Sequence, residues 1–190
     1  MGQDKGFKLD LKYWDFASQL VQGLWFYICQ HYGEKAEMPE TLVAFIPARV
    51  LKKYVEKFHD SLSASILEEY KTNKNFNDIT MIYFGALSDG SGRSFRLIAI
   101  CKAELARTRR YLTRHLNRAV TLSETLLIPL IHETIHMFEE VTGKIYLDHS
   151  ISAVTEAEKA IFSHFKNDHP EYFSEQTEKI ISKLIAQVPD

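Results

Sequence analysis

The 190-residue sequence lacks the features that mark disulfide-rich, membrane-spanning and strongly basic proteins. It has two cysteines, Cys29 and Cys101, which are far apart and form no Cys-x-x-Cys pair, so they are expected to be reduced thiols. The longest apolar runs, such as 24–29 and 126–131, are too short to cross a bilayer, and residues 1–6 contain no signal-peptide core. The net charge is -2, so no overall basicity demands a nucleic-acid partner. These absences predict a cytoplasmic protein with no membrane contact.

Apolar and aromatic residues are plentiful, at 45% and 12% of the chain, which is enough for one good core. No repeat, low-complexity tract or linker divides the sequence. We therefore expect a single α+β domain over 1–190 that is mainly helical, with a small sheet or hairpin beside the helix that carries the site. Residues 1–72 form its helical N-terminal part, and 78–190 hold the sheet and the site helices.

Hydrophobic periodicity predicts the individual elements. Spacing of three and four predicts helices over 11–32, 47–70, 102–117, 152–166 and 171–187. The β-branched and aromatic segments 41–46, 79–84 and 95–101 favour strands, and the turn at 88–92 predicts that the last two form a hairpin.

One further helix is bounded by clear signals. Thr121 and Glu124 have the spacing of a capping box, and Gly143 offers a C-terminal stop. Pro129 interrupts the pattern, because a proline beyond the first turn removes a backbone hydrogen bond. The helix is therefore expected either to begin anew near Leu126 or to be kinked at the proline.

This helix contains His132, Glu133 and His136, which spell H-E-x-x-H. Two imidazoles four residues apart lie on the same helix face, so both can bind one tetrahedral Zn²⁺. Glu133 then lies beside the metal, where it can act as general base on an attacking water and later protonate the leaving amine. The alternative is a buried helix whose histidines only satisfy backbone groups.

A catalytic zinc takes three protein ligands, so a third donor is needed. Glu156 lies twenty residues after His136, in the run Ala-Val-Thr-Glu-Ala from 153 to 157. Here the sequence resembles thermolysin-type gluzincins, whose third ligand is a glutamate at this separation on a second helix. The resemblance implies that Glu156 ligates zinc. Ala160 stands where that family has an aspartate orienting a zinc histidine, so this support would come from elsewhere.

His149 is the alternative third ligand. The strand Arg-Leu-Ile-Ala at 96–99, the approach Glu-Thr-Leu-Leu at 124–127 and the exit Val-Thr-Gly at 141–143 resemble the SprT or Spartan family of small zincins. In that family a histidine just after the helix completes the zinc site, which implies His149 in this role. The same resemblance implies a substrate class of proteins bound or crosslinked to DNA.

Several other residues have weaker signals. Tyr146 is a candidate hydrogen-bond donor to a tetrahedral oxyanion, with packing as the alternative. Glu139 and Glu140 are expected to be exposed acids. The segment 102–118 is the only strongly basic one, and it is either a solvated helix face or a contact for nucleic acid or an acidic partner. Its arginines are Arg107, Arg109, Arg110, Arg114 and Arg118.

The sequence therefore predicts a zincin-like metallopeptidase that uses Zn²⁺ and hydrolyses peptide bonds in a peptide or protein substrate. One alternative is a SprT-like protease acting on DNA-bound proteins. Another is a zincin-fold protein that no longer cleaves and serves in binding or regulation, although the intact Glu133 argues against it. A third is a helical interaction protein without metal.

Overall fold

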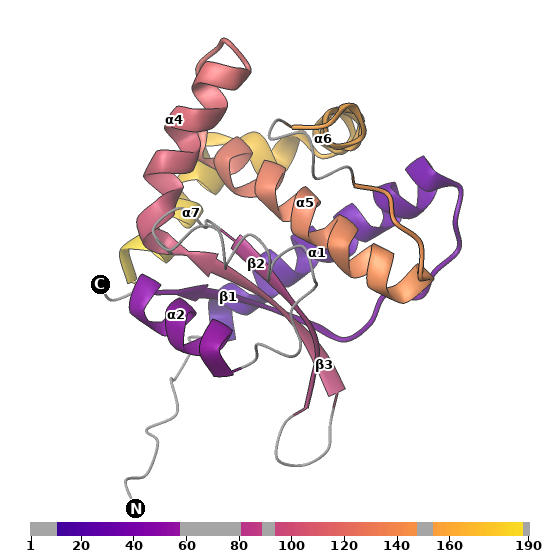
Figure 1. The fold of residues 1–190 in the computed structure, drawn as a ribbon. Helices are drawn as coiled ribbons and strands as arrows, with labels where there is room; N and C mark the ends of the chain where they lie inside the picture. The colour runs from indigo at the N-terminus through magenta and orange to yellow at the C-terminus, as the bar shows by residue number, and fades with distance from the viewer. Residues whose placement is uncertain (1–10, 58–80, 89–93, 148–153, 188–190) are drawn as a thin grey trace, which may run out of the picture.

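The computed structural model describes residues 11–57, 81–88, 94–147 and 154–187. They form an α+β fold in which helices surround a small three-stranded sheet (Figure 1). Along the first half of the chain the elements are α1 (Leu11–Tyr32), β1 (Thr41–Ile46), α2 (Ala48–Lys57), β2 (Met81–Ser88) and β3 (Ser94–Cys101). The predicted first helix and first strand are confirmed at both ends. The continuation of the second helix to residue 70 lies outside the described residues.

The sheet has the strand order β1-β3-β2. β1 runs parallel to β3, and β2 pairs antiparallel with β3, which confirms the predicted hairpin. β2 extends beyond its predicted end at Phe84 to Ser88, across a register shift between Phe84 and Leu87. The segment 41–46 therefore belongs to the same sheet as the later strands.

Alternate residues of each strand belong to two different cores. Val43, Tyr83 and Ile98 face the large core shared with α1, whereas Ala44 and Ile82 belong to a smaller cluster with residues of α2. This alternation follows from the two-residue period of a strand. The strands are apolar on both faces because both faces are covered.

The long central helix is α5 (Leu122–Thr142), and it begins with the predicted capping box between Thr121 and Glu124. The expectation of a new start near Leu126 is wrong, because a single α-helix runs through Pro129. Packing on both sides of the proline outweighs the loss of one backbone hydrogen bond. Gly143 ends the helix in the left-handed conformation, at φ 68°.

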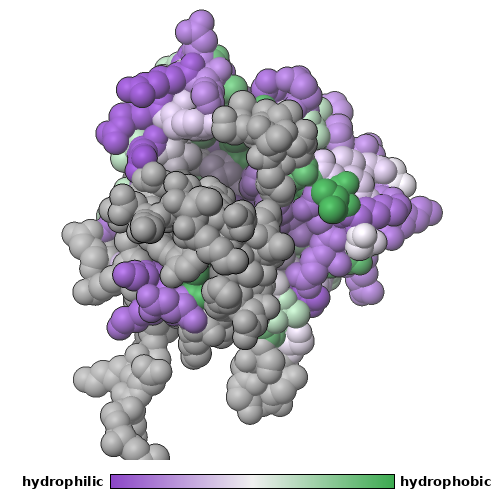
Figure 2. Space-filling view, in the orientation of Figure 1, coloured by the Kyte–Doolittle hydropathy of each residue, from purple (hydrophilic) through white to green (hydrophobic). Residues whose placement is uncertain are grey.

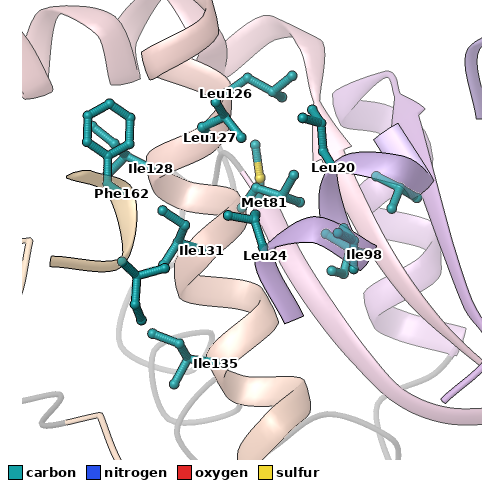
Figure 3. Close-up of a cluster of buried hydrophobic side chains, with 14 of the residues drawn as sticks. Leu20, Leu24, Met81, Ile98, Leu126, Leu127, Ile128, Ile131, Ile135 and Phe162 are labelled. Carbon is teal, nitrogen blue, oxygen red and sulfur yellow. The ribbon is translucent and has the colours of Figure 1, made fainter. Parts of the chain in front are cut away.

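Residues from α1, the sheet and α5 meet in the core (Figure 3). Leu126, Leu127 and Ile131 of α5 lie near Leu20 and Leu24 of α1 in this cluster. All five side chains are at most 1% exposed. Burial on this scale stabilises the fold by about 1.5–3 kcal/mol for each large aliphatic side chain before entropy is counted. The helix with the histidines is therefore the central packing element.

The remaining elements cover α5. A short 3-10 helix (Lys102–Glu104) leads into α4 (Leu105–His115), and the chain ends with α6 (Glu156–Asp168), a second 3-10 helix (Pro170–Phe173) and α7 (Glu175–Gln187). Thr155, not Ser152, is the N-cap of α6, because its hydroxyl and Glu158 complete a capping box. Ser152 itself lies outside the described residues. Among the residues that the structure describes, no helix is long and apolar enough to span a membrane.

Candidate metal centre

His132 and His136 lie on adjacent turns of α5, and the Nε2 atoms of their rings are in contact. The two Nε2 atoms are 3.1 Å apart, and the ring planes are inclined at 85°. Two ligands of a tetrahedral zinc ion at the usual Zn–N distance lie about 3.3 Å from each other. The observed separation therefore fits two ligands of one ion.

The Nδ1 atom of each ring forms a hydrogen bond with a carboxylate. His132 Nδ1 is 2.8 Å from Glu158 Oε1, and His136 Nδ1 is 2.9 Å from Glu139 Oε2. An ionised carboxylate only accepts hydrogen bonds, so both Nδ1 atoms carry a proton. In a neutral imidazole the other nitrogen, Nε2, is then a bare acceptor.

The contact between the two Nε2 atoms, at 3.1 Å, is compatible with a shared proton and also with one metal ion bound to both. Carboxylates that orient metal-binding histidines through Nδ1 are the usual outer shell of zinc sites. The donor chemistry of the histidine pair therefore fits zinc.

The surrounding carboxylates favour positive charge at the histidine pair. Burial acts to lower the pKa of His132, but the hydrogen bond to Glu158 and the charges of Glu133, Glu158 and Glu139 raise it, and the net pKa is raised. For Glu158 and Glu139, burial acts to raise the pKa, but their hydrogen bonds to the histidines and to main-chain N–H groups hold it below its usual range. Both carboxylates thus stay ionised. The site concentrates negative charge around the two rings.

The site opens toward solvent on one side. The side chain of His132 is 37% exposed, whereas that of His136 is 6% exposed. Glu158 is 4% exposed. An ion or a water molecule can therefore reach the pair past His132, while His136 and the supporting carboxylates are shielded.

Glu133 lies at the edge of the sheet. Its Oε2 accepts a hydrogen bond of 2.8 Å from the backbone N–H of Tyr83 in β2, and the residue is 8% exposed. The hydroxyl of Tyr83 donates to Glu140, which also binds Arg96 at 2.9 Å. β2 thus orients Glu133 through its main chain and fixes the neighbouring part of α5 through Tyr83.

The structure does not bring Glu156 to the histidines. Its side chain is 90% exposed and pairs with Lys159 at 2.6 Å. As the first residue of α6 it points outward, whereas Glu158, two positions later, points to His132. His149 lies outside the described residues. Within the described part of the chain no third histidine, cysteine, aspartate or glutamate joins the pair as a ligand.

Tyr146 contacts the site through its main-chain N–H group. Its hydroxyl lies 3.4 Å from Glu34, while its N–H donates to Glu139 Oε1 at 2.6 Å. The expectation that Glu139 and Glu140 are exposed acids is wrong for Glu139 and confirmed for Glu140. Glu139 is 13% exposed on its side chain and binds His136, and Glu140 binds Tyr83 and Arg96.

The arginine segment divides into two groups. Arg109 donates to the carbonyl of Val120 at 2.8 Å, and Arg118 forms a two-pronged pair with Glu124, so both serve the fold. The exposed residues of this segment lie on a hydrophilic face of α4, seen at the top left of Figure 2. The exposed arginines on that helix face are Arg107, Arg110 and Arg114.

Three residues of the site had no separate signal in the sequence. The signal that could have indicated Glu158 is its position as the third residue of a capping box after Thr155. For Glu139 that signal is its spacing of three residues from His136. Tyr83 had no signal beyond its place in a strand. These contacts depend on how α6 and β2 pack against α5.

No model of a known protein family, no curated protein and no solved structure matches the chain. The geometry of the histidine pair therefore carries the functional argument.

Proposed function

We propose that the chain is a zinc-dependent metallopeptidase in which His132 and His136 hold the ion and Glu133 is the general base. The observation that carries the proposal is the pair of Nε2 atoms at 3.1 Å, with a carboxylate behind each ring. A structural explanation of the two histidines would pair their nitrogens with backbone groups. Here the Nδ1 atoms donate to carboxylates, as in zinc sites.

The residues of the chain would divide the work as follows. Bound zinc would polarise the substrate carbonyl and make water a better nucleophile at neutral pH. Glu158 and Glu139 keep the two rings in the tautomer that carries its proton on Nδ1, so that Nε2 can ligate the ion. Glu133 takes a proton from the attacking water and passes it to the leaving amine. The main-chain N–H of Tyr83 orients Glu133 for this transfer.

The position of the sheet supports a peptide substrate and a zincin-like fold. β2 lies at the edge of the three-stranded sheet, and it packs against α5. An edge strand can bind an extended peptide through main-chain hydrogen bonds. Because Glu133 reaches Tyr83 of this strand, a peptide bound along β2 would pass next to the proposed base.

The third ligand remains a proposal from the sequence. Glu156 points away from the pair, so His149 is the residue that the sequence still offers. Replacing His149 with Gln is expected to weaken zinc binding, whereas Glu156→Gln is expected to leave it unchanged. Equal zinc affinity in His149→Gln and wild type would reject His149 as a ligand.

Two measurements on the full chain test the proposal. Elemental analysis of protein reconstituted with zinc is expected to give about one ion per chain, as a single site of this kind requires. Casein digestion is expected to be lost in Glu133→Gln while zinc remains bound. Glu140→Gln is the matched control, because Glu140 lies on the same helix and binds Tyr83 and Arg96. The proposal fails if wild type binds no zinc.

Cleavage of DNA-bound proteins is the second candidate function. The exposed Arg107, Arg110 and Arg114 on one face of α4 favour it. DNA binding that weakens as salt rises, and that weakens further in a variant with these three arginines changed to glutamine, would support it. Zinc-bound wild type that digests no protein, with or without DNA, would instead favour a non-cleaving binding protein.

A further inference from the structure

Each carboxylate that binds a histidine also accepts hydrogen bonds from main-chain N–H groups through its other oxygen. Glu139 Oε1 accepts hydrogen bonds from the N–H groups of Tyr146 and Leu147, at 2.6 and 2.7 Å. Glu158 Oε2 accepts from the N–H of Thr155 at 2.5 Å, as part of the capping box of α6. The two histidines are thus connected to two separate main-chain segments.

These segments depend on the carboxylates in a way that regular elements do not. The residues after Gly143 up to Leu147 have no helix or strand hydrogen bonds, so Glu139 supplies acceptors for two of their N–H groups. Thr155 precedes the first turn of α6, where N–H groups have no partner inside the helix. Both carboxylates are largely shielded from water, at 13% and 4% exposure, which strengthens such charge-assisted bonds.

We propose that occupancy of the histidine pair by a divalent metal ion is coupled to the local stability of these two segments, 144–147 and the N-terminus of α6. This inference rests on the proposed function, because it assumes that the pair binds a metal ion. Its new content is that Glu139 and Glu158 are positioning residues that connect the metal site to the fold.

The coupling follows from the contacts of the two rings. A metal ion bound to both Nε2 atoms would fix both rings, whereas without it rotation of either ring breaks the hydrogen bond from its Nδ1 atom to Glu139 or Glu158. The released carboxylate then loses one of the contacts that fix its orientation, so the N–H groups on its other oxygen open to water more often. A metal ion holds both rings in place and removes this opening. By linkage, a change that weakens the hydrogen bond between a carboxylate and its histidine also weakens metal binding.

Hydrogen exchange of the full chain, with zinc and with a chelator, tests the coupling. The amides of Tyr146, Leu147 and Thr155 are expected to exchange about tenfold more slowly with zinc, a factor within the usual range for coupled sites. Exchange of β3 is expected to be the same in both conditions. Zinc bound at one ion per chain with no change in these amides would overturn the inference and leave the proposed function intact. Absence of zinc binding would overturn both.

Two variants show whether the carboxylates are the connection. In Glu139→Gln the zinc effect is expected to shrink at Tyr146 and Leu147 but to persist at Thr155, and in Glu158→Gln the reverse is expected. Glu140→Gln is expected to keep both effects. Full zinc protection of both segments in both variants, at saturating zinc, would overturn the role of the carboxylates. If either variant fails to fold, the comparison of wild type with and without zinc still decides the coupling.

Discussion

The two ends of α5 hold buried carboxylates in opposite electrostatic settings. At the N-terminal end, Glu124 is 1% exposed and binds Arg118 and Lys166 as well as the backbone of Thr121. Toward the C-terminal end, Glu139 and Glu158 bind the two histidines instead of fixed cations. Both regions carry buried negative charge, but only the first contains its own permanent positive charges.

This difference separates a structural network from the proposed metal site. Arg118 and Lys166 both lie beside the carboxylate of Glu124, so the N-terminal network contains its own positive charge within the fold. The histidines can supply positive charge only by binding a proton, and their Nε2 atoms face each other. A bound cation would add positive charge to the second network, as the proposed metal site requires.

The largest expected effect comes from removing both histidines. His132→Gln combined with His136→Gln is expected to weaken zinc binding on the order of 10³-fold or more, because deprotonated ligands supply the binding energy. The melting temperature in chelator is expected to stay close to that of wild type, since each glutamine amide can donate a hydrogen bond to the carboxylate that the imidazole contacted. Competition with a chromogenic chelator measures the affinity. A large loss of stability in chelator would show that the pair serves the fold.

The opposite pattern is expected for the N-terminal network. Glu124→Gln is expected to destabilise the fold by about 2 kcal/mol, because a buried charge-assisted network loses its anion, while partly exposed Arg118 and Lys166 regain water. Zinc affinity is expected to stay unchanged. Urea unfolding in chelator measures the stability. Glu156→Gln is the matched control, because that carboxylate is 90% exposed and should change stability by less than about 0.5 kcal/mol. Equal stability of the two variants would contradict the comparison.

Smaller effects on zinc are expected from the carboxylates behind the rings. Glu158→Gln and Glu139→Gln are each expected to weaken zinc binding about 10- to 100-fold, as outer-shell changes do. The physical reason is that the amide N–H₂ group can turn toward Nδ1 and favour the tautomer with a proton on Nε2. Chelator competition against Glu140→Gln provides the measurement and the control. Unchanged affinity in both variants would show that the rings need no support.

The smallest expected effect is the acid dependence of the N-terminal network. Burial acts to raise the pKa of Glu124, but Arg118, Lys166 and the N–H of Thr121 together lower it to about 2. The pKa of a glutamate in the unfolded chain is about 4.3, so the folded pKa is depressed. The stabilisation is fully present above the unfolded pKa and is lost as pH falls through the folded pKa. As pH falls from about 4.5 toward 2, the stability gap between wild type and Glu124→Gln is expected to close. Unfolding in chelator at several pH values measures it, and a constant gap would contradict the assigned pKa.

Much of the fold followed from local patterns. The segments 11–32 and 41–46 were predicted at both ends because helical and strand periodicity is a property of neighbouring residues. The start of α6 was misplaced at Ser152, because two hydroxyl residues, Ser152 and Thr155, could each cap it and the Thr155 box prevailed. Pro129 was expected to break or kink α5. The helix does not begin anew near Leu126, because core packing on both sides of the proline, which is not a local property, supports one continuous helix.

The candidate site also combines features that follow from local sequence with features that depend on packing. The sequence by itself determined that His132, Glu133 and His136 share one helix, because a spacing of four places side chains on one face of any α-helix. Only the tertiary structure decided which acid supports His132, since Glu158 comes from 26 residues away on a helix packed against α5. It also turned Glu156 into solvent and placed Tyr83 against Glu133. The physical reason is that carboxylates two residues apart at a helix N-terminus point in different directions, and the packing of α6 against α5 determines which one faces the histidine pair.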